Sequence, residues 1–178
     1  MRLYVDYSAR MKDDTTLADR ARMETKKLQD GDPENTKLWK QFYKISLAEF
    51  GKIYVLLSVK FDYMYGESHY KDLLPGVVQE ALEKGVAKRS EGAVIIPVPD
   101  KAPFVIQKSD EAFLYATTDI ATVKHRVKQW RPNLILYVVG NEQALHLEQL
   151  FYAVKQLEIV GRETLFHVKF GMILGEDM

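Results

Sequence analysis

The sequence predicts an α/β protein in which helices and a small antiparallel sheet precede part of a parallel sheet. Three observations support this fold class. Residues 1–57 show no strand pattern, and residues 86–108 contain short apolar runs separated by turn residues. From residue 110 onwards apolar strands and helices alternate, which is typical of a parallel sheet with helical crossovers.

Helices are expected in the amino-terminal part. Residues 14–29 are charged and compatible with a helix, which the turn sequence Gly31-Asp32-Pro33 ends. A second helix is expected over residues 34–57, because apolar residues recur close to the helical period at Leu38, Phe42, Ile45, Phe50, Ile53, Tyr54 and Leu57. We interpret residues 1–57 as a helical arm.

The middle part, residues 58–109, is expected to combine a helix with short strands. Residues 59–65 are expected to be extended. Proline in the first turn and Gly85 after the end predict a helix over residues 75–84. Turn residues then separate three short apolar strands, which we expect to form an antiparallel meander: residues 86–89, 93–98 and 104–108.

Residues 110–178 are expected to form the second half of a Rossmann-type domain. Strands and helices are predicted to alternate here: strand 113–115, helix 117–130, strand 134–139, helix 142–157 and strand 165–170. A doubly wound sheet normally begins with a strand–helix–strand half, and no such pattern precedes this part. We therefore interpret the sequence as a middle piece of a larger domain, which follows a helical and antiparallel-β insertion.

Composition excludes several classes of site. The 178 residues include no cysteine, which excludes disulfides and thiolate metal sites. No apolar run approaches the roughly 18 to 20 residues of a membrane span. The first residues, Met-Arg-Leu-Tyr-Val-Asp-Tyr, lack the apolar core of a signal peptide. We expect a soluble cytoplasmic protein with no membrane partner.

The charges are balanced, with 25 basic and 25 acidic residues. The whole chain thus lacks the basic excess that is common among nucleic-acid binders. Two local groups of bases are interpreted as solvated helix faces, with a nucleic-acid contact as the alternative: Arg20, Arg22, Lys26 and Lys27, and then Lys124, Arg126, Lys128 and Arg131.

Polar side chains follow the ends of two expected strands, where ligands bind in open α/β sheets. Tyr115 and Asp119 are four residues apart, which places both on one face of a helix. A carboxylate beside a phenol favours a cation, and a guanidinium fits best because its planar fork can meet both oxygens. The alternatives are that Asp119 pairs with Lys124 or Arg126, and that Tyr115 is a core aromatic.

The second of these strand ends runs from Gly140 to Gln143. Gly140 leads from a strand into a helix, where backbone amides favour an anion or a ribose. Gln143 offers donors and an acceptor, with an ordinary surface position as the alternative. His146, one turn later, could bind a ribose or phosphate oxygen or be an ordinary helix histidine. His69 and His125 are expected at the surface or in packing, and no metal site is expected from the histidine spacing.

Several segments occur in a specific order and spacing: Leu28-Gln29-Asp30-Gly31-Asp32, Leu38-Trp39, Ser46-Leu47-Ala48-Glu49-Phe50, Ile53-Tyr54, Val59-Lys60-Phe61-Asp62, Gly66-Glu67-Ser68-His69-Tyr70, Ser90-Glu91-Gly92-Ala93, Tyr115-Ala116-Thr117-Thr118-Asp119 and Phe170-Gly171-Met172-Ile173-Leu174-Gly175. Together they resemble the catalytic domain of the arginyl-tRNA synthetases, a family of class I aminoacyl-tRNA synthetases. The resemblance extends over nearly the whole chain.

The resemblance implies ATP-dependent activation of L-arginine and its transfer to tRNA-Arg. It implies that Tyr115, Asp119 and Gln143 bind the substrate L-arginine. It also implies an ATP site near Gly140, His146, His167, Phe170, Gly171 and Met172. Mg²⁺ is expected with ATP, while this chain is expected to contribute no catalytic residue and no metal ligand.

The sequence also departs from the family pattern. The signature that grips the ATP phosphates would lie before residue 1, and the lysine-rich mobile loop would follow Met178. Glu111 stands where the family commonly has glycine. We therefore expect a fragment of an arginine–tRNA ligase that is inactive alone. The alternatives are a truncated paralogue that binds arginine or a nucleotide without ligase activity, and a helical piece that recruits a partner through residues 1–57.

Overall fold

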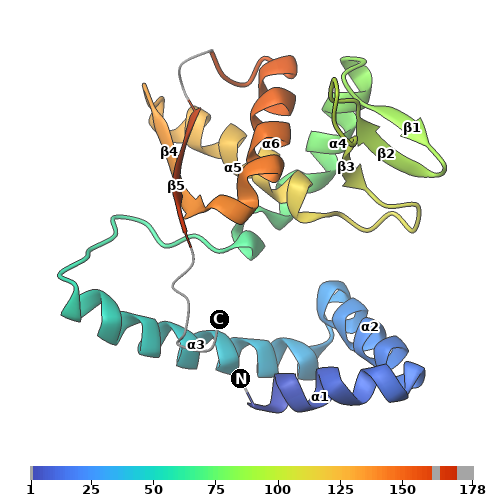
Figure 1. The fold of residues 1–178 in the computed structure, drawn as a ribbon, viewed down its shortest axis with the longest axis vertical. Helices are drawn as coiled ribbons and strands as arrows, with labels where there is room; N and C mark the ends of the chain where they lie inside the picture. The colour runs from blue at the N-terminus through green and yellow to red at the C-terminus, as the bar shows by residue number, and fades with distance from the viewer. Residues whose placement is uncertain (1, 162–164, 172–178) are drawn as a thin grey trace. The chain divides into compact units, whose positions relative to one another are not determined.

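The computed structural model describes residues 2–161 and 165–171. The chain divides into two compact units, Met1–Tyr63 and Met64–Met178, which are coloured from blue to red along the chain in Figure 1. The first unit is helical and the second combines helices with two small sheets. The mixed α/β fold expected from the sequence is therefore confirmed. Its predicted division into 1–57, 58–109 and 110–178 stays a prediction.

The first unit consists of α1 (Arg2–Asp13), α2 (Thr15–Asp30) and α3 (Pro33–Leu56). The Asp14 side chain caps α2 by accepting from the Thr16 amide, and Asp32 caps α3 by accepting from the Asn35 amide. Gly31 ends α2 with a φ of 86°, a left-handed conformation that glycine adopts without a steric penalty. The two expected helices are confirmed, whereas α1 was not predicted.

The second unit begins with η1 (Glu67–Leu73) and α4 (Leu74–Glu83). Pro75 lies in the first turn of α4, as expected, and Gly85 follows its end with a φ of 67°. Residues 59–65 contain no strand. The expected meander is present: β1 (Lys88–Ser90), β2 (Ala93–Ile96) and β3 (Phe104–Gln107) pair antiparallel in that order.

The carboxyl-terminal part alternates as predicted, with one correction. It contains α5 (Tyr115–Trp130), β4 (Ile135–Gly140), η2 (Asn141–Gln143), α6 (Ala144–Gln156) and β5 (Leu165–Phe170), and β4 pairs parallel with β5. The predicted strand 113–115 is wrong. Phe113 makes one isolated bridge to Gln107, and the amides of Thr117 and Thr118 already bond the Leu114 carbonyl, so that the helix starts at Tyr115.

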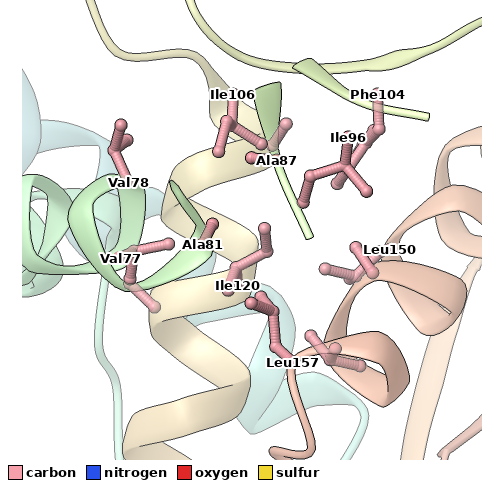
Figure 2. Packing of buried hydrophobic residues seen from close by; sticks show 14 of the residues in the cluster. Val77, Val78, Ala81, Ala87, Ile96, Phe104, Ile106, Ile120, Leu150 and Leu157 are labelled. Carbon is pink, nitrogen blue, oxygen red and sulfur yellow. The ribbon is translucent and has the colours of Figure 1, made fainter. Parts of the chain in front are cut away.

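The core of the second unit surrounds α5. Figure 2 shows Ile120 of α5 between Val77 and Ala81 of α4 on one side and Leu150 of α6 on the other. The inward residues of β2 and β3 cover the same cluster: Val94, Ile96, Phe104 and Ile106. Burial of these side chains fixes the position of α5, because α5 packs against α4, α6 and β3 at once.

The parallel strands lie beside α6, on the side away from the antiparallel sheet (Figure 1). Ile135 is buried, and Tyr137 and Val139 pack partly against the core. Leu136 and Val138 alternate with them and are 52% and 62% exposed. The strand β4 therefore has one face on the core and one apolar face open. Of the helices in residues 2–161, none has the length and apolar composition needed to cross a membrane.

Candidate functional site

The first turn of α5 holds Tyr115 and Asp119. Leu114 precedes the helix in an extended conformation, so that Tyr115 is its first residue and Asp119 lies one turn later on the same face. The Thr117 hydroxyl, on the other face, donates to the carbonyl of Ile106 in β3. The antiparallel sheet therefore fixes the part of the helix that carries the two candidate side chains.

The segment from β4 to α6 positions Gly140, Gln143 and His146. Gly140 is the last residue of β4, and η2 carries the chain directly into α6. Gln143 is exposed at the start of α6, and His146 lies within the first turn. The Gln149 side chain donates to the carbonyl of Ala102, at 2.7 Å. This bond anchors the middle of α6 to the loop between β2 and β3.

Three of the predicted residues come together where α5 and α6 meet. His146 Nε2 lies 2.6 Å from Asp119 Oδ2, and the imidazole ring packs against the Tyr115 ring with centroids 4.7 Å apart. The ring of Phe104 in β3 also contacts the imidazole, with a centroid distance of 5.4 Å to His146. The Asp119 side chain is 35% exposed and His146 is 13% exposed. The carboxylate is thus reachable from solvent, whereas the histidine is largely enclosed.

The bases that could have neutralised Asp119 are engaged elsewhere. Lys124 forms an ion pair with Glu80 of α4, and the Arg126 guanidinium lies over the Tyr137 ring, with Cζ 5.6 Å from its centroid. Among the described residues, no lysine or arginine forms an ion pair with Asp119. A reachable carboxylate that pairs with no lysine or arginine is suited to a cationic ligand.

Tyr137 lies beneath this site and was not singled out by the sequence. Its hydroxyl is buried, and within residues 2–161 and 165–171 it has no hydrogen-bond partner. Burial raises the pKa of Tyr137 to about 12, with the Asp119 charge acting in the same direction and the Arg126 charge opposing it. The phenol therefore stays neutral near the carboxylate. The sequence could have indicated Tyr137 only through its position in the apolar strand, where alternate residues face opposite sides of the sheet.

Phe104 was also not singled out. It is buried at the start of β3, and its ring faces His146. An apolar residue in a short strand gives no indication that it borders a site, because the contact depends on how α6 packs against the antiparallel sheet.

Three of the residues expected near ATP, Gly140, Phe170 and Gly171, lie at the ends of the parallel strands. Gly140 and Phe170 are direct neighbours in the register of β4 and β5, and Phe170 and Gly171 are exposed. His167 Nε2 lies 3.1 Å from the carbonyl of Val139 on the adjacent strand. Met172 lies outside the described residues. His146, the sixth member of this predicted set, contacts Asp119 instead of lying at the strand ends.

His69 and His125 are packing residues remote from Asp119. Their rings contact each other edge to face at 5.3 Å, and both adjoin Tyr65 and Tyr70. The part of the chain that the structure describes contains no group of three His, Asp or Glu side chains that could hold a metal ion. These residues therefore do not make a magnesium site, and the expectation of Mg²⁺ with ATP stays a prediction.

Comparison with known proteins identifies the family of the chain. A family model for the catalytic domain of class I tRNA synthetases (R) matches residues 1–178. The arginine–tRNA ligase of Chloroflexus aggregans is 43% identical over 176 residues, which is 98% of this chain and 31% of that protein. The ligase of Fusobacterium nucleatum subsp. nucleatum is 42% identical over 180 residues, with 99% and 31% covered.

A solved structure supports the same relationship. The crystal structure of arginyl-tRNA synthetase from Plasmodium falciparum matches with a TM-score of 0.77 at 28% identity, covering 90% of this chain and 29% of that one. The chain spans about a third of the length of the curated relatives that it matches, 31% in each case given above. It belongs to the family of class I arginyl-tRNA synthetases, as part of their catalytic domain.

Proposed function

We propose that Tyr115, Asp119 and Gln143 bind the side chain of L-arginine. The observation that carries this proposal is the Asp119 carboxylate, which is partly exposed one helical turn from Tyr115 and has no lysine or arginine partner in the described structure. A guanidinium can donate two parallel hydrogen bonds to the two oxygens of such a group. Gln143 is exposed one turn before His146 on the helix that carries the Asp119 contact, and it would add donors and an acceptor for the same ligand.

The same chemistry predicts selectivity against lysine. An ammonium is compact and cannot reproduce the two parallel bonds of the planar fork. A bound lysine would leave part of the carboxylate and the neighbouring polar groups without partners. Because unpaired buried polar groups cost free energy, such a site rejects the wrong side chain more strongly than size alone would allow.

For the complete protein we propose arginine–tRNA ligase activity, in keeping with the family. The arginine carboxylate would attack the α-phosphate of ATP to give arginyl-adenylate and pyrophosphate, and the arginyl group would pass to a terminal ribose hydroxyl of tRNA-Arg. Gly140, His167, Phe170, Gly171 and Met172 would lie near the nucleotide. Catalysis would rest on positioning and charge stabilisation, and a cytoplasmic location fits a protein of this kind.

Titration of the labelled 178-residue chain with L-arginine, followed by nuclear magnetic resonance, tests the arginine site. We expect saturable shifts at residues 115–119 and 143–146 with L-arginine, and weaker ones with L-lysine or with L-citrulline, which has the shape of arginine without its charge. Asp119→Asn should weaken arginine binding at least about tenfold, because it removes the charge-assisted bonds. Asp100→Asn, on the turn after β2, is the matched control.

Two outcomes would contradict this proposal. Equal shifts with arginine and with citrulline would show that the carboxylate does not recognise the charge of the guanidinium. Unchanged arginine affinity in Asp119→Asn would remove Asp119 from the site. Arginine-dependent exchange of pyrophosphate into ATP by the complete protein tests the ligase activity, and binding without exchange would favour a paralogue that only holds arginine.

A further inference from the structure

The orientation of the Asp119 carboxylate is set from outside its own helix. An aspartate side chain can choose among staggered χ1 rotamers, and its terminal torsion is broad, so that the position and plane of the carboxylate are free unless a partner fixes them. On α5 its nearest turn offers no base, and its oxygen contacts His146 Nε2 on α6, at 2.6 Å. An ionised carboxylate has only acceptors, so Nε2 carries the hydrogen in this contact.

His146 is itself held in place by packing. Its side chain is 13% exposed, and its ring lies against both Phe104 and Tyr115, with centroids 5.4 Å and 4.7 Å away. Two rings on different elements leave the imidazole little freedom to rotate. A histidine restrained in this way also restrains the orientation of the carboxylate to which it is hydrogen-bonded.

The two helices that carry this pair are anchored to neighbouring parts of the antiparallel sheet. Thr117 of α5 donates to the carbonyl of Ile106 in β3. Gln149 of α6 donates to the carbonyl of Ala102, two residues before β3. The distance between Asp119 and His146 is therefore defined by short connections through one sheet, although the residues are 27 positions apart in the chain.

We infer that His146 is a positioning residue of the arginine side-chain site, where it orients the Asp119 carboxylate for a guanidinium. This inference rests on the proposed binding of arginine by Asp119. One bond from Nε2 uses one lone pair of Oδ2 and leaves Oδ1 and the second lone pair of Oδ2 available. Those acceptors suit the two donors of the fork, so the histidine restrains the carboxylate without blocking it.

The predicted contact of His146 with ATP is the alternative. The Asp119 contact occupies Nε2, and only Nδ1 remains for a nucleotide oxygen. The two roles predict different consequences of substitution. A positioning residue affects arginine binding and the conformation of Asp119, whereas a nucleotide residue affects ATP binding.

The test compares His146→Gln with His146→Ala and His146→Asn in the 178-residue chain. Glutamine places an N–H donor near the position of Nε2, whereas asparagine is too short and alanine has no donor. Leu145→Ala, at an exposed position on the same turn, is the control for changes in the helix. If the alanine variant does not fold, the comparison between glutamine and asparagine decides the outcome.

The first measurement needs no ligand. Three-bond couplings from the Asp119 carboxyl carbon to the backbone nitrogen and carbonyl carbon report its χ1 rotamer. We expect one rotamer in the parent chain and in His146→Gln, and averaged couplings in His146→Ala and His146→Asn. Unchanged couplings in all variants would overturn the positioning role, whether or not the chain binds arginine.

The second measurement is the affinity for L-arginine and for ATP. We expect arginine to bind about tenfold more weakly to His146→Ala and His146→Asn, and within about twofold of the parent chain to His146→Gln, as for the loss of one oriented hydrogen bond. ATP binding and the unfolding midpoint should change little. Loss of ATP binding with intact arginine affinity would overturn the inference in favour of the nucleotide role. Failure of Asp119→Asn to alter arginine binding would count against the proposed function, while the couplings still decide the His146–Asp119 relationship.

Discussion

At the scale of single residues, Glu111 shows how a turn before the site is maintained. Its φ is 65°, in the left-handed region that favours glycine. The turn is closed by bonds from the Glu111 amide to the Lys108 carbonyl and from the Lys108 amide to the Ala112 carbonyl. Glu111 thus adopts a backbone conformation that glycine takes up more easily.

Replacing Glu111 with glycine should stabilise the second unit. Glycine avoids a left-handed penalty of roughly 1 to 2 kcal/mol but adds freedom to the unfolded chain, so a net gain of about 0.5 to 1 kcal/mol is expected. Urea unfolding measures the free energy of unfolding. Ala112→Gly, at the next position, should instead destabilise the chain, and a destabilised Glu111→Gly variant would show that the glutamate side chain supports the turn.

Residue patterns within one helical turn were predictable, and contacts between elements were not. Tyr115 and Asp119 share a face because they are four residues apart on α5. The contact between Asp119 and His146 joins two helices and depends on the packing of both against the antiparallel sheet. No spacing rule in a single sequence encodes that distance. The expected contact of His146 with ATP stays a prediction.

At the scale of elements, the attachment of α5 to β3 determines where the site begins. The Thr117 hydroxyl is fully buried and donates to a carbonyl that lies in a different element. The helix α1 was not predicted, although Arg2–Asp13 has the amphipathic spacing of a helix. The strand expected at 113–115 was wrong because three apolar residues fit a strand or the entry to a buried helix equally well.

Thr117→Val should destabilise the second unit by about 1 to 2 kcal/mol, because the Ile106 carbonyl loses its side-chain donor in the core. Thr122→Val is the matched control. The Thr122 side chain is also buried, but its hydroxyl donates to the Thr118 carbonyl within the same helix. In Thr122→Val that carbonyl keeps the hydrogen bond from the helix backbone. Urea unfolding of both variants measures the difference, and an equal loss would indicate that the contact between α5 and β3 contributes nothing specific.

At the scale of the whole molecule, buried ionisable groups set how stability responds to pH. The Lys124 and Lys84 side chains beside Glu80 hold the pKa of that carboxyl below its usual value. The ion pair between Glu80 and Lys124 joins α4 to α5. Tyr137 behaves in the opposite sense, since burial raises its pKa to about 12 from 10.0. Below pH 10 the phenol of Tyr137 is mostly neutral in both the folded and the unfolded chain. Tyr137 therefore changes the pH dependence of the free energy of unfolding only in alkali.

Tyr137→Phe should therefore protect the fold at high pH. Above pH 10 the unfolded tyrosine ionises while the folded one does not, and stability falls as the pH rises towards 12. Between pH 7 and pH 11 the free energy of unfolding should fall by about 1 kcal/mol less in the variant than in the parent chain. Urea unfolding at pH 7 to 11 measures this, with Tyr115→Phe, an exposed tyrosine, as the control. Parallel curves for parent and variant would show that Tyr137 is not desolvated as described.

The strand β4 connects the core to the site by a fixed length, and this limits how such proteins can diverge. Each residue advances the chain by about 3.3 Å and reverses the side that it faces. Deleting Ile135 or Leu136 would reverse the side that Tyr137 and Val139 face relative to the preceding chain, or draw α6 and with it His146 away from Asp119. Substitutions can accumulate along this strand over long lineages, whereas insertions and deletions should be confined to the turns around it.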